Sequence, residues 1–227
     1  SNLGNDLTIS AAGGGGGTAG LESGTGTDSM QSASSLTTVA ANASAPDTIA
    51  LGDGAIASSA NNIAIGNTAN GGGDNAFARG NIAIGFNTDA TNEKDVAIGN
   101  EAQATGSRSV AIGDGANASG SRSVVVGASS SATAFSSAVF GAFSTASAEG
   151  ATVVGGYGSS ATQVDAIAVG KEADALAAGA ISIGKLAQAT ATDAIALGKD
   201  VTAAIAETLS VKAIELQTDS TPTLGGI

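Results

Sequence analysis

A short hydrophobic pattern recurs along most of the chain at a nearly constant spacing. Each copy reads apolar, small, apolar, glycine, as in the run from Val96 to Gly99, and eight of the ten gaps between successive glycines are 14 residues long. The gap before Gly170 is 15 residues, and the gap before Gly85 is 19 residues, which indicates a five-residue insertion within or near residues 70–75. A period this short cannot hold a helix pair or a propeller blade, so it predicts one coil of a parallel β-solenoid per copy. The repeat glycines are Gly52, Gly66, Gly85, Gly99, Gly113, Gly127, Gly141, Gly155, Gly170, Gly184 and Gly198, and a degraded twelfth copy follows at Leu209, Ser210, Val211 and Lys212.

Alternation within each coil predicts two strands, because neighbouring residues on a strand point to opposite sides. The first strand carries larger apolar residues three and one before the glycine, such as Val110 and Ile112, and the second carries small residues three and five after it, such as Ala116. We interpret these four columns as the interior, with large residues packed on small ones. One coil supports this by compensation, since the first column shrinks to Ala138 where the second grows to Phe140. The glycine then ends the first strand at a turn that needs a positive φ.

The residue between the two large apolar positions is small and almost always apolar. On this interpretation it points out of the tube, where a solvated surface would favour polar residues. Long apolar stripes are uncommon on monomers, so we expect identical stripes to meet around a three-fold axis. The alternative is an exposed stripe with no partner. The predicted trimer interface consists of Ala97, Ala111, Val125, Val139, Val153, Ala168 and Ala196.

Coils such as residues 109–120, which read SVAIGDGANASG, resemble the head repeats of trimeric autotransporter adhesins, the YadA-like family. The resemblance covers about residues 47–212. It implies an all-β, left-handed parallel β-roll of about twelve 14-residue coils, assembled as a homotrimer that attaches one surface to another. It brings no catalytic residues and no cofactor. Similar heads also occur in fibres and appendages of bacteriophages, so the fold does not fix the setting.

The repeat divides the chain into three parts. Residues 1–45 are rich in Gly, Ser and Ala and are predicted to be an attachment or tether segment, residues 46–212 form the roll, and residues 213–227 form a tail. No heptad stalk or barrel strands are evident, and residues 221–226, TPTLGG, resemble a short sequence of phage fibre proteins. We therefore expect a virion appendage that docks through residues 1–45 and contacts a host-surface receptor. The alternative is the head of a bacterial adhesin on the outer-membrane surface.

Composition excludes several classes of function. The net charge of −12 argues against binding nucleic acid or an anionic membrane, which needs clustered Lys and Arg. The chain has no His and no Cys, so it lacks the usual general base, the thiolate nucleophile and the usual transition-metal ligands. The chain contains no run of 18 consecutive apolar residues, so membrane insertion is not expected. It also contains no catalytic motif. The sequence predicts a protein that is not an enzyme and that holds no metal or cofactor.

Most basic residues fall in two columns of the repeat. Stacked about 4.8 Å apart, like charges repel, so acidic neighbours are expected within reach. One hypothesis is solvated turns with local or intersubunit pairing, and the other is a strip that faces a ligand. The first column holds Lys94, Arg108 and Arg122, the second holds Lys171, Lys185 and Lys199, and the expected acidic neighbours are Glu101, Asp114, Glu172 and Asp200.

Three other features suggest binding. Residues 71–74 superficially resemble glycine-rich calcium repeats, but their ligands do not recur in every coil, which argues against calcium. An ice-binding face would need paired Thr columns, whereas the nearest column of Ser and Thr, represented by Thr105, is single. Exposed aromatic residues and the insertion could contact a partner. The possible partner contacts are Phe143, Asp74, Lys171, Lys185 and Lys199.

Overall fold

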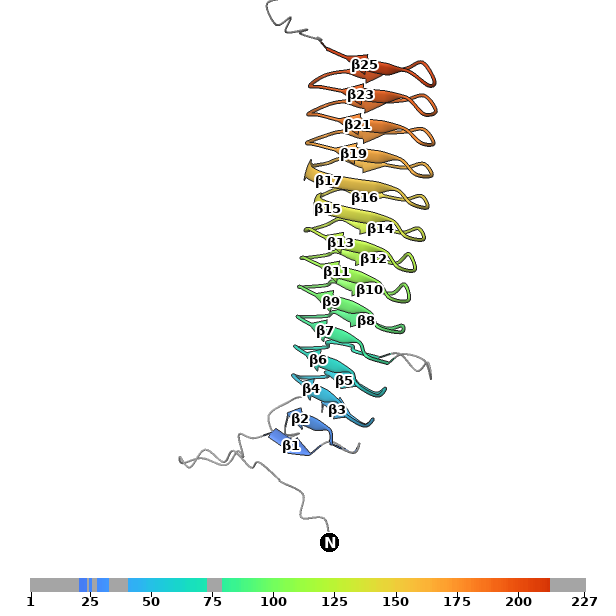
Figure 1. The fold of residues 1–227 in the computed structure, drawn as a ribbon. Coiled ribbons are helices and arrows are strands. Elements are labelled where there is room, and N and C mark those ends of the chain that lie inside the picture. The colour runs from blue at the N-terminus through green and yellow to red at the C-terminus, as the bar shows by residue number, and fades with distance from the viewer. Residues whose placement is uncertain (1–20, 24, 26–27, 33–40, 73–78, 213–227) are drawn as a thin grey trace, which may run out of the picture.

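The coils of the chain stack along one axis to form a rod (Figure 1). The computed structural model describes residues 21–23, 25, 28–32, 41–72 and 79–212. Within these residues every element of secondary structure is a β-strand, and the coils form a parallel β-solenoid. Between Ile49 and Val211 one face of the solenoid carries twelve strands, one per coil, which repeat at the predicted spacing. The predicted roll of about twelve 14-residue coils is therefore confirmed.

Two sheets run along the rod. The first sheet stacks β1 (Leu21–Ser23), β2 (Met30–Ser32), β4 (Ile49–Leu51), β6 (Ile63–Ile65), β7 (Ile82–Ile84), β9 (Val96–Ile98), β11 (Val110–Ile112), β13 (Val124–Val126), β15 (Ala138–Ala142), β17 (Thr152–Tyr157), β19 (Ile167–Val169), β21 (Ile181–Ile183), β23 (Ile195–Leu197) and β25 (Leu209–Val211). The second stacks β8 (Asp89–Ala90), β10 (Gln103–Ala104), β12 (Asn117–Ala118), β14 (Ser131–Ala132), β16 (Thr145–Ala146), β18 (Ser160–Ala161), β20 (Asp174–Ala175), β22 (Gln188–Ala189) and β24 (Thr202–Ala203). A separate parallel pair, β3 (Asn42–Ala43) with β5 (Ile56–Ala57), precedes the second sheet.

The pairing register turns each column of the repeat into a ladder along the rod. Val110 pairs with the residues 14 before and 14 after it, and the strands are parallel throughout except that β1 and β2 are antiparallel. The five extra residues lie between Asn70 and Ile82, because Asn70 still pairs with Asp89 in the second sheet. Pairing with the roll already begins at β2 and β3, before residue 46. The attachment role of residues 1–45 stays a prediction.

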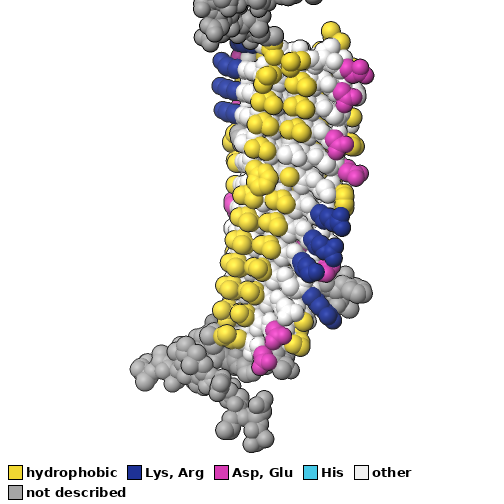
Figure 2. Space-filling view, viewed as in Figure 1, with side chains coloured by type: hydrophobic (Ala, Val, Ile, Leu, Met, Phe, Trp, Pro, Cys, Tyr) yellow, Lys and Arg dark blue, Asp and Glu magenta, His cyan; other side chains and the backbone are white. Residues whose placement is uncertain are grey.

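The interior is lined by small residues and not by the large apolar ones. In the coil of Gly99 the side chains of Ala97, Ala102 and Ala104 are fully buried, whereas those of Val96 and Ile98 are only partly buried and point outward. The same pattern holds in the first strand of the coils from Gly52 to Gly198, and the large side chains form yellow columns on the outside (Figure 2). The interpretation of the small columns of the second strand as interior is confirmed, and that of the large columns of the first strand is wrong.

Space explains this inversion. A 14-residue coil brings its two short strands so close together that the largest fully buried side chains are those of Val125, Val139 and Val153. An Ile or Phe has no room between the strands, so the first strand turns its larger side chains to the outside. Phe140, predicted to fill the core, is accordingly 45% exposed.

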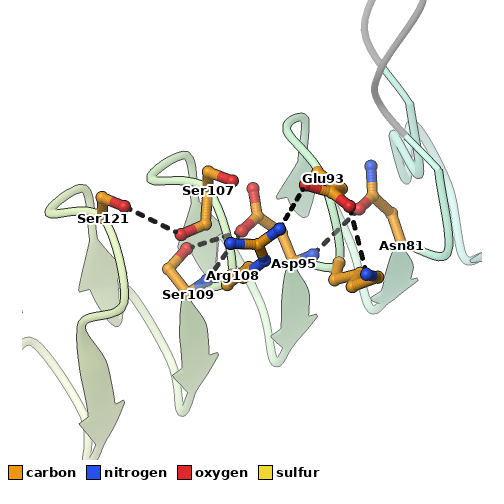
Figure 3. Close-up of polar contacts among 8 residues, drawn as sticks. Asn81, Glu93, Asp95, Ser107, Arg108, Ser109 and Ser121 are labelled. Carbon is orange, nitrogen blue, oxygen red and sulfur yellow. Dashed lines mark hydrogen bonds and ion pairs between the residues drawn. The ribbon is translucent and has the colours of Figure 1, made fainter.

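A ladder of polar side chains runs inside the N-terminal half of the roll, at the position four before each repeat glycine (Figure 3). The side-chain oxygen of Asn62 accepts from the backbone N–H of Asn81 at 2.9 Å, Asn81 accepts from that of Asp95 at 2.9 Å, and Asp95 accepts from that of Ser109 at 2.8 Å. The same Asp95 oxygen accepts from the Ser109 hydroxyl at 3.0 Å, and its second oxygen accepts from the N–H of Asn92 at 2.9 Å. The ladder therefore ties one coil to the next where backbone groups are buried.

The glycine column marks the closest approach between coils. Gly85 has φ near 140°, and a Cβ there would overlap the carbonyl oxygen of Gly99 and lie 2.7 Å from its carbon. Gly155 differs because its coil is bulged next to β15 and because nothing lies within 4 Å of its missing Cβ. The predicted positive φ is confirmed at both positions and at the other repeat glycines except Gly141, which lies inside the longer strand β15.

These two glycines form a matched pair for a stability test. We expect Gly85→Ala to lower the free energy of unfolding by about 3 kcal/mol, since it combines backbone strain with a clash against the next coil. Gly155→Ala meets no clash and costs only what a left-handed backbone conformation costs alanine, so it should lower the free energy of unfolding by about 1 kcal/mol. Urea or thermal unfolding followed by circular dichroism measures both. Equal losses would show that contact between coils is not what requires glycine.

Asp95 makes the stability of the roll depend on pH. Burial raises the pKa of Asp95 above its usual value, although hydrogen bonds from Ser109 and Asn92 oppose the shift. The folded chain then holds the proton more tightly than the unfolded chain, so the free energy of unfolding falls as pH rises from about 4 through the raised pKa. Asp95→Asn removes this titration. The melting temperature of the variant minus that of the wild type should rise between about pH 4 and pH 7, and a flat or falling difference would contradict the assignment.

Candidate subunit interface

A partly exposed apolar stripe follows the first sheet along the whole roll, with one half-buried column and one more exposed column. It consists of the side chains three and one before each repeat glycine, which stand side by side as two columns in Figure 2. Ile112 and Ile183 are 36% and 37% exposed, and Leu197 is 44% exposed. The stripe contains Ile49, Leu51, Ile63, Ile65, Ile82, Ile84, Val96, Ile98, Val110, Ile112, Val124, Val126, Ala138, Phe140, Thr152, Val154, Ile167, Val169, Ile181, Ile183, Ile195, Leu197, Leu209 and Val211.

The column predicted as the trimer interface lies between these two columns but points the other way. Its members are fully buried within the single chain, packed against the small side chains of the second strand. They cannot contact another subunit, so the prediction that this column forms an exposed stripe is wrong. The apolar side chains that lie on the outside of this sheet are the ones that the sequence interpretation placed in the interior. The affected residues are Ala97, Ala111, Val125, Val139, Val153, Ala168 and Ala196.

Two turns border the stripe, and each holds a residue in the left-handed conformation in nearly every coil. We call the residues five and six before the repeat glycine the leading edge, and the residues one and two after it the trailing edge. Left-handed residues such as Arg108 and Glu172 form the corners of the coil, so their side chains project into solvent. Charged side chains can therefore line both sides of the apolar stripe.

On the leading edge, Glu93 holds two basic side chains. Its carboxylate lies 3.1 Å from the Lys94 ammonium and 3.0 Å from the Arg108 guanidinium of the next coil (Figure 3). The hydrogen bond with Lys94 is the main reason that the pKa of Glu93 is lowered. Glu101 and Asp114 were expected to be the acidic neighbours of this basic column, but they lie on the trailing edge, on the other side of the stripe. Lys94 and Arg108 therefore find their acid on their own edge, whereas Arg122 lies over the Phe135 ring, 5.3 Å from its centroid.

On the trailing edge, the expected local pairing is confirmed. Lys171 lies 3.3 Å from Glu172, and Lys199 lies 3.5 Å from Asp200. Lys185 is exposed in the coil between them, where the next residue is Leu186. The sequence predicted these acids because each follows its lysine directly.

An aromatic corner interrupts the trailing edge at the bulged coil. The rings of Phe143 and Tyr157 lie 4.8 Å apart, both are more than half exposed, and the Lys171 ammonium lies 6.0 Å from the Tyr157 ring. The bulge pairs Ala142 with Tyr157 and so brings the two rings together. Phe143 and the lysine column are thus accessible in the single chain, and their contact with a partner stays a prediction. Asp74 lies outside the described residues.

The second sheet presents a polar face. Its outward side chains include Ser131 with Thr133 and Thr145 with Ser147. In these coils the column of Ser and Thr represented by Thr105 therefore has a second hydroxyl side chain beside it. Sequence reasoning missed this pairing because it did not place the residue between the two buried small positions on the outer face. The neighbouring column also holds acids and amides, such as Asp174 and Gln188, so a regular hydroxyl lattice covers only part of the rod.

The described residues hold no cluster of three or more His, Cys, Asp or Glu side chains that could bind a metal ion. In that same part of the chain, no helix is long and apolar enough to cross a membrane.

Comparison with known proteins connects this geometry to a family. No curated protein matches the sequence significantly. The family model of the YadA head domain repeat matches residues 43–69, 82–102, 104–130, 156–173 and 175–200, just over half of the chain. The matched segments lie within the stacked coils, and the resemblance deduced from the repeat is confirmed. The chain therefore belongs to the YadA head repeat family.

Proposed function

We propose that the chain is the non-enzymatic head of a homotrimeric surface fibre, and that three rolls pack side by side through their apolar stripes. The observation that carries this proposal is the exposed apolar stripe, which extends over twelve coils of a single chain. Isolated apolar side chains are normal on a surface, but a continuous stripe bordered by charged turns is typical of a protein interface. The family match supports a role as an adhesin-like fibre.

The shape of the stripe favours a closed assembly of a few rods. It is only two side chains wide but as long as the roll, and three such narrow faces can enclose one axis. Burying it removes apolar area from water at roughly 25 cal/mol per Å². The polar second sheet then faces outward, where it can contact another surface. The roll would thus serve as a stiff spacer with adhesive sides.

We further propose a virion appendage as the setting, with residues 1–45 as the docking segment and a host surface as the target. The resemblance of residues 221–226 to phage fibre proteins supports this setting. The head of a bacterial adhesin at the outer-membrane surface is the alternative, and the family match fits both.

The trimer can be tested by placing charge on the stripe. Ile112→Glu with Ile183→Glu introduces two carboxylates per chain at exposed stripe positions, and burying them in an interface is unfavourable. Light scattering should show three chains per particle for the wild type and a single chain of 21.2 kDa for the variant. Circular dichroism should show strand content retained, because both side chains point away from the core.

The matched control places the same charges on the second sheet. Thr145→Glu with Thr202→Glu lies on exposed positions of the polar face, where the paired residues of the neighbouring coils are not acidic, and should leave three chains per particle. A wild-type particle of one chain at micromolar concentration, or loss of the trimer in the control variant, would contradict the proposed interface.

The setting can be tested in the source organism. Mass spectrometry of purified virions and of outer membranes from the same culture should detect roll peptides in the virion fraction. Detection in outer membranes alone would replace the virion setting with the bacterial alternative. The trimer would be unaffected by that result.

A further inference from the structure

The two edges that border the stripe carry opposite charges, and both signs change at the middle of the roll. Figure 2 shows this for the upper half, where basic side chains lie on one side of the stripe and acidic ones on the other. The leading edge holds Arg79, Lys94, Arg108 and Arg122 with the acids Asp47 and Glu93 in its lower half, and Glu149, Asp165, Asp193 and Glu207 in its upper half. The trailing edge holds Asp53, Glu101 and Asp114 in its lower half, and Lys171, Lys185 and Lys199 with the acids Glu172 and Asp200 in its upper half. The first coil is the exception to the alternation, because both of its edges are acidic, with Asp47 and Asp53.

Opposite charges also recur within single coils, six residues apart. Arg108 stands opposite Asp114, Asp165 opposite Lys171, and Asp193 opposite Lys199. In the described part of the chain, no ion pair joins a leading edge to a trailing edge. Six residues of extended chain span about 20 Å, so the two groups of such a pair are too far apart to meet within one roll.

A cyclic trimer would bring these groups together. Cyclic symmetry places all subunits at the same height and sets one side of each subunit against the other side of its neighbour. The trailing edge of one roll then meets the leading edge of the next at the same coil, where the charges are opposite. We propose that these edges form intersubunit ion pairs, which set the orientation and register of the rolls. The proposal rests on the trimer of the proposed function.

The stripe itself supports the same arrangement. Phe140, on the side next to the trailing edge, is the largest side chain in the stripe, and Ala138, on the side next to the leading edge, is the smallest. In a cyclic trimer Phe140 of one roll packs beside Ala138 of its neighbour. The compensation in size that the sequence suggested for the core therefore operates between subunits. The exposed rings of Phe135 and Phe143 lie on opposite edges of this coil, where the charges change sign.

The pairing can be tested by reversing charges. Asp165→Lys with Asp193→Lys makes the upper leading edge basic, so it should repel the lysines of the neighbouring trailing edge. We expect the melting temperature of the trimer to fall by several degrees, and by less at high salt, which screens exposed charges. Adding Lys171→Asp and Lys199→Asp restores opposite signs and should recover most of the loss. Thr145→Lys with Thr202→Lys, at exposed positions of the second sheet whose paired residues are uncharged, is the control and should change the melting temperature little.

The outcomes separate this proposal from the trimer itself. A monomeric wild type would remove both. A trimeric wild type whose Asp165→Lys, Asp193→Lys variant melts like the control would overturn the edge pairing alone. An antiparallel pair of rolls would set like edges together at opposite heights, so the fourfold reversal would then be less stable than the twofold one. That result, with two chains per particle, would also overturn the proposed arrangement.

Size complementarity gives an independent check. Ala138→Ile should lower the melting temperature of the trimer, because Phe140 of the neighbour occupies that space. Adding Phe140→Val should restore it. If Ala138→Ile is tolerated alone, the two side chains do not face each other across an interface.

Discussion

Close stacking of one short coil on the next is the constraint on which the structure depends. Most coils bring their glycine against the carbonyl group of the next repeat glycine, and each passes two strands around an interior filled mainly by alanine. Alanine buries little apolar area per residue, so the core cannot stabilise the roll as the core of a globular domain does. The repetition of backbone hydrogen bonds and of the Asn62 to Ser109 ladder between coils supplies the rest. Stability then accumulates along the rod.

The same constraint produces the surface through which we propose that the rolls assemble. Because the interior admits nothing much larger than valine, the isoleucines of the first strand must lie outside. A single roll therefore leaves its most hydrophobic face in water, and association removes that cost. Folding and assembly are linked in this way, since a partner that binds only the folded roll stabilises it. The apolar stripe follows from the narrow coil as much as from any separate requirement for binding.

The sequence predicted the period, the parallel strands and the number of coils, because these follow from spacing, and the residues of the repeat, as in 109–120, carried the resemblance to the family. It did not predict which face of the first strand lies inside. Alternation defines two sets of side chains, and the usual rule that large residues lie inside fails when the space is too narrow. A signal was present: the buried position of Ala97 stays small in every coil, whereas the outer positions range from Ala138 to Phe140. Glu93 was missed as the partner of Arg108 because the two lie 15 residues apart and meet only through stacking.

A repeat also creates ambiguity of register, and the exceptions to the repeat resolve it. The isoleucine and valine stripe is nearly unchanged by a shift of one coil, so it cannot by itself fix how far one roll slides along another. A shift of several coils would set like charges together, because the signs of both edges change midway along the rod. Smaller shifts would move Phe140 away from Ala138 and against a larger side chain such as Val124 or Thr152. Residues that break the repeat thus carry the information on assembly that the repeat itself lacks.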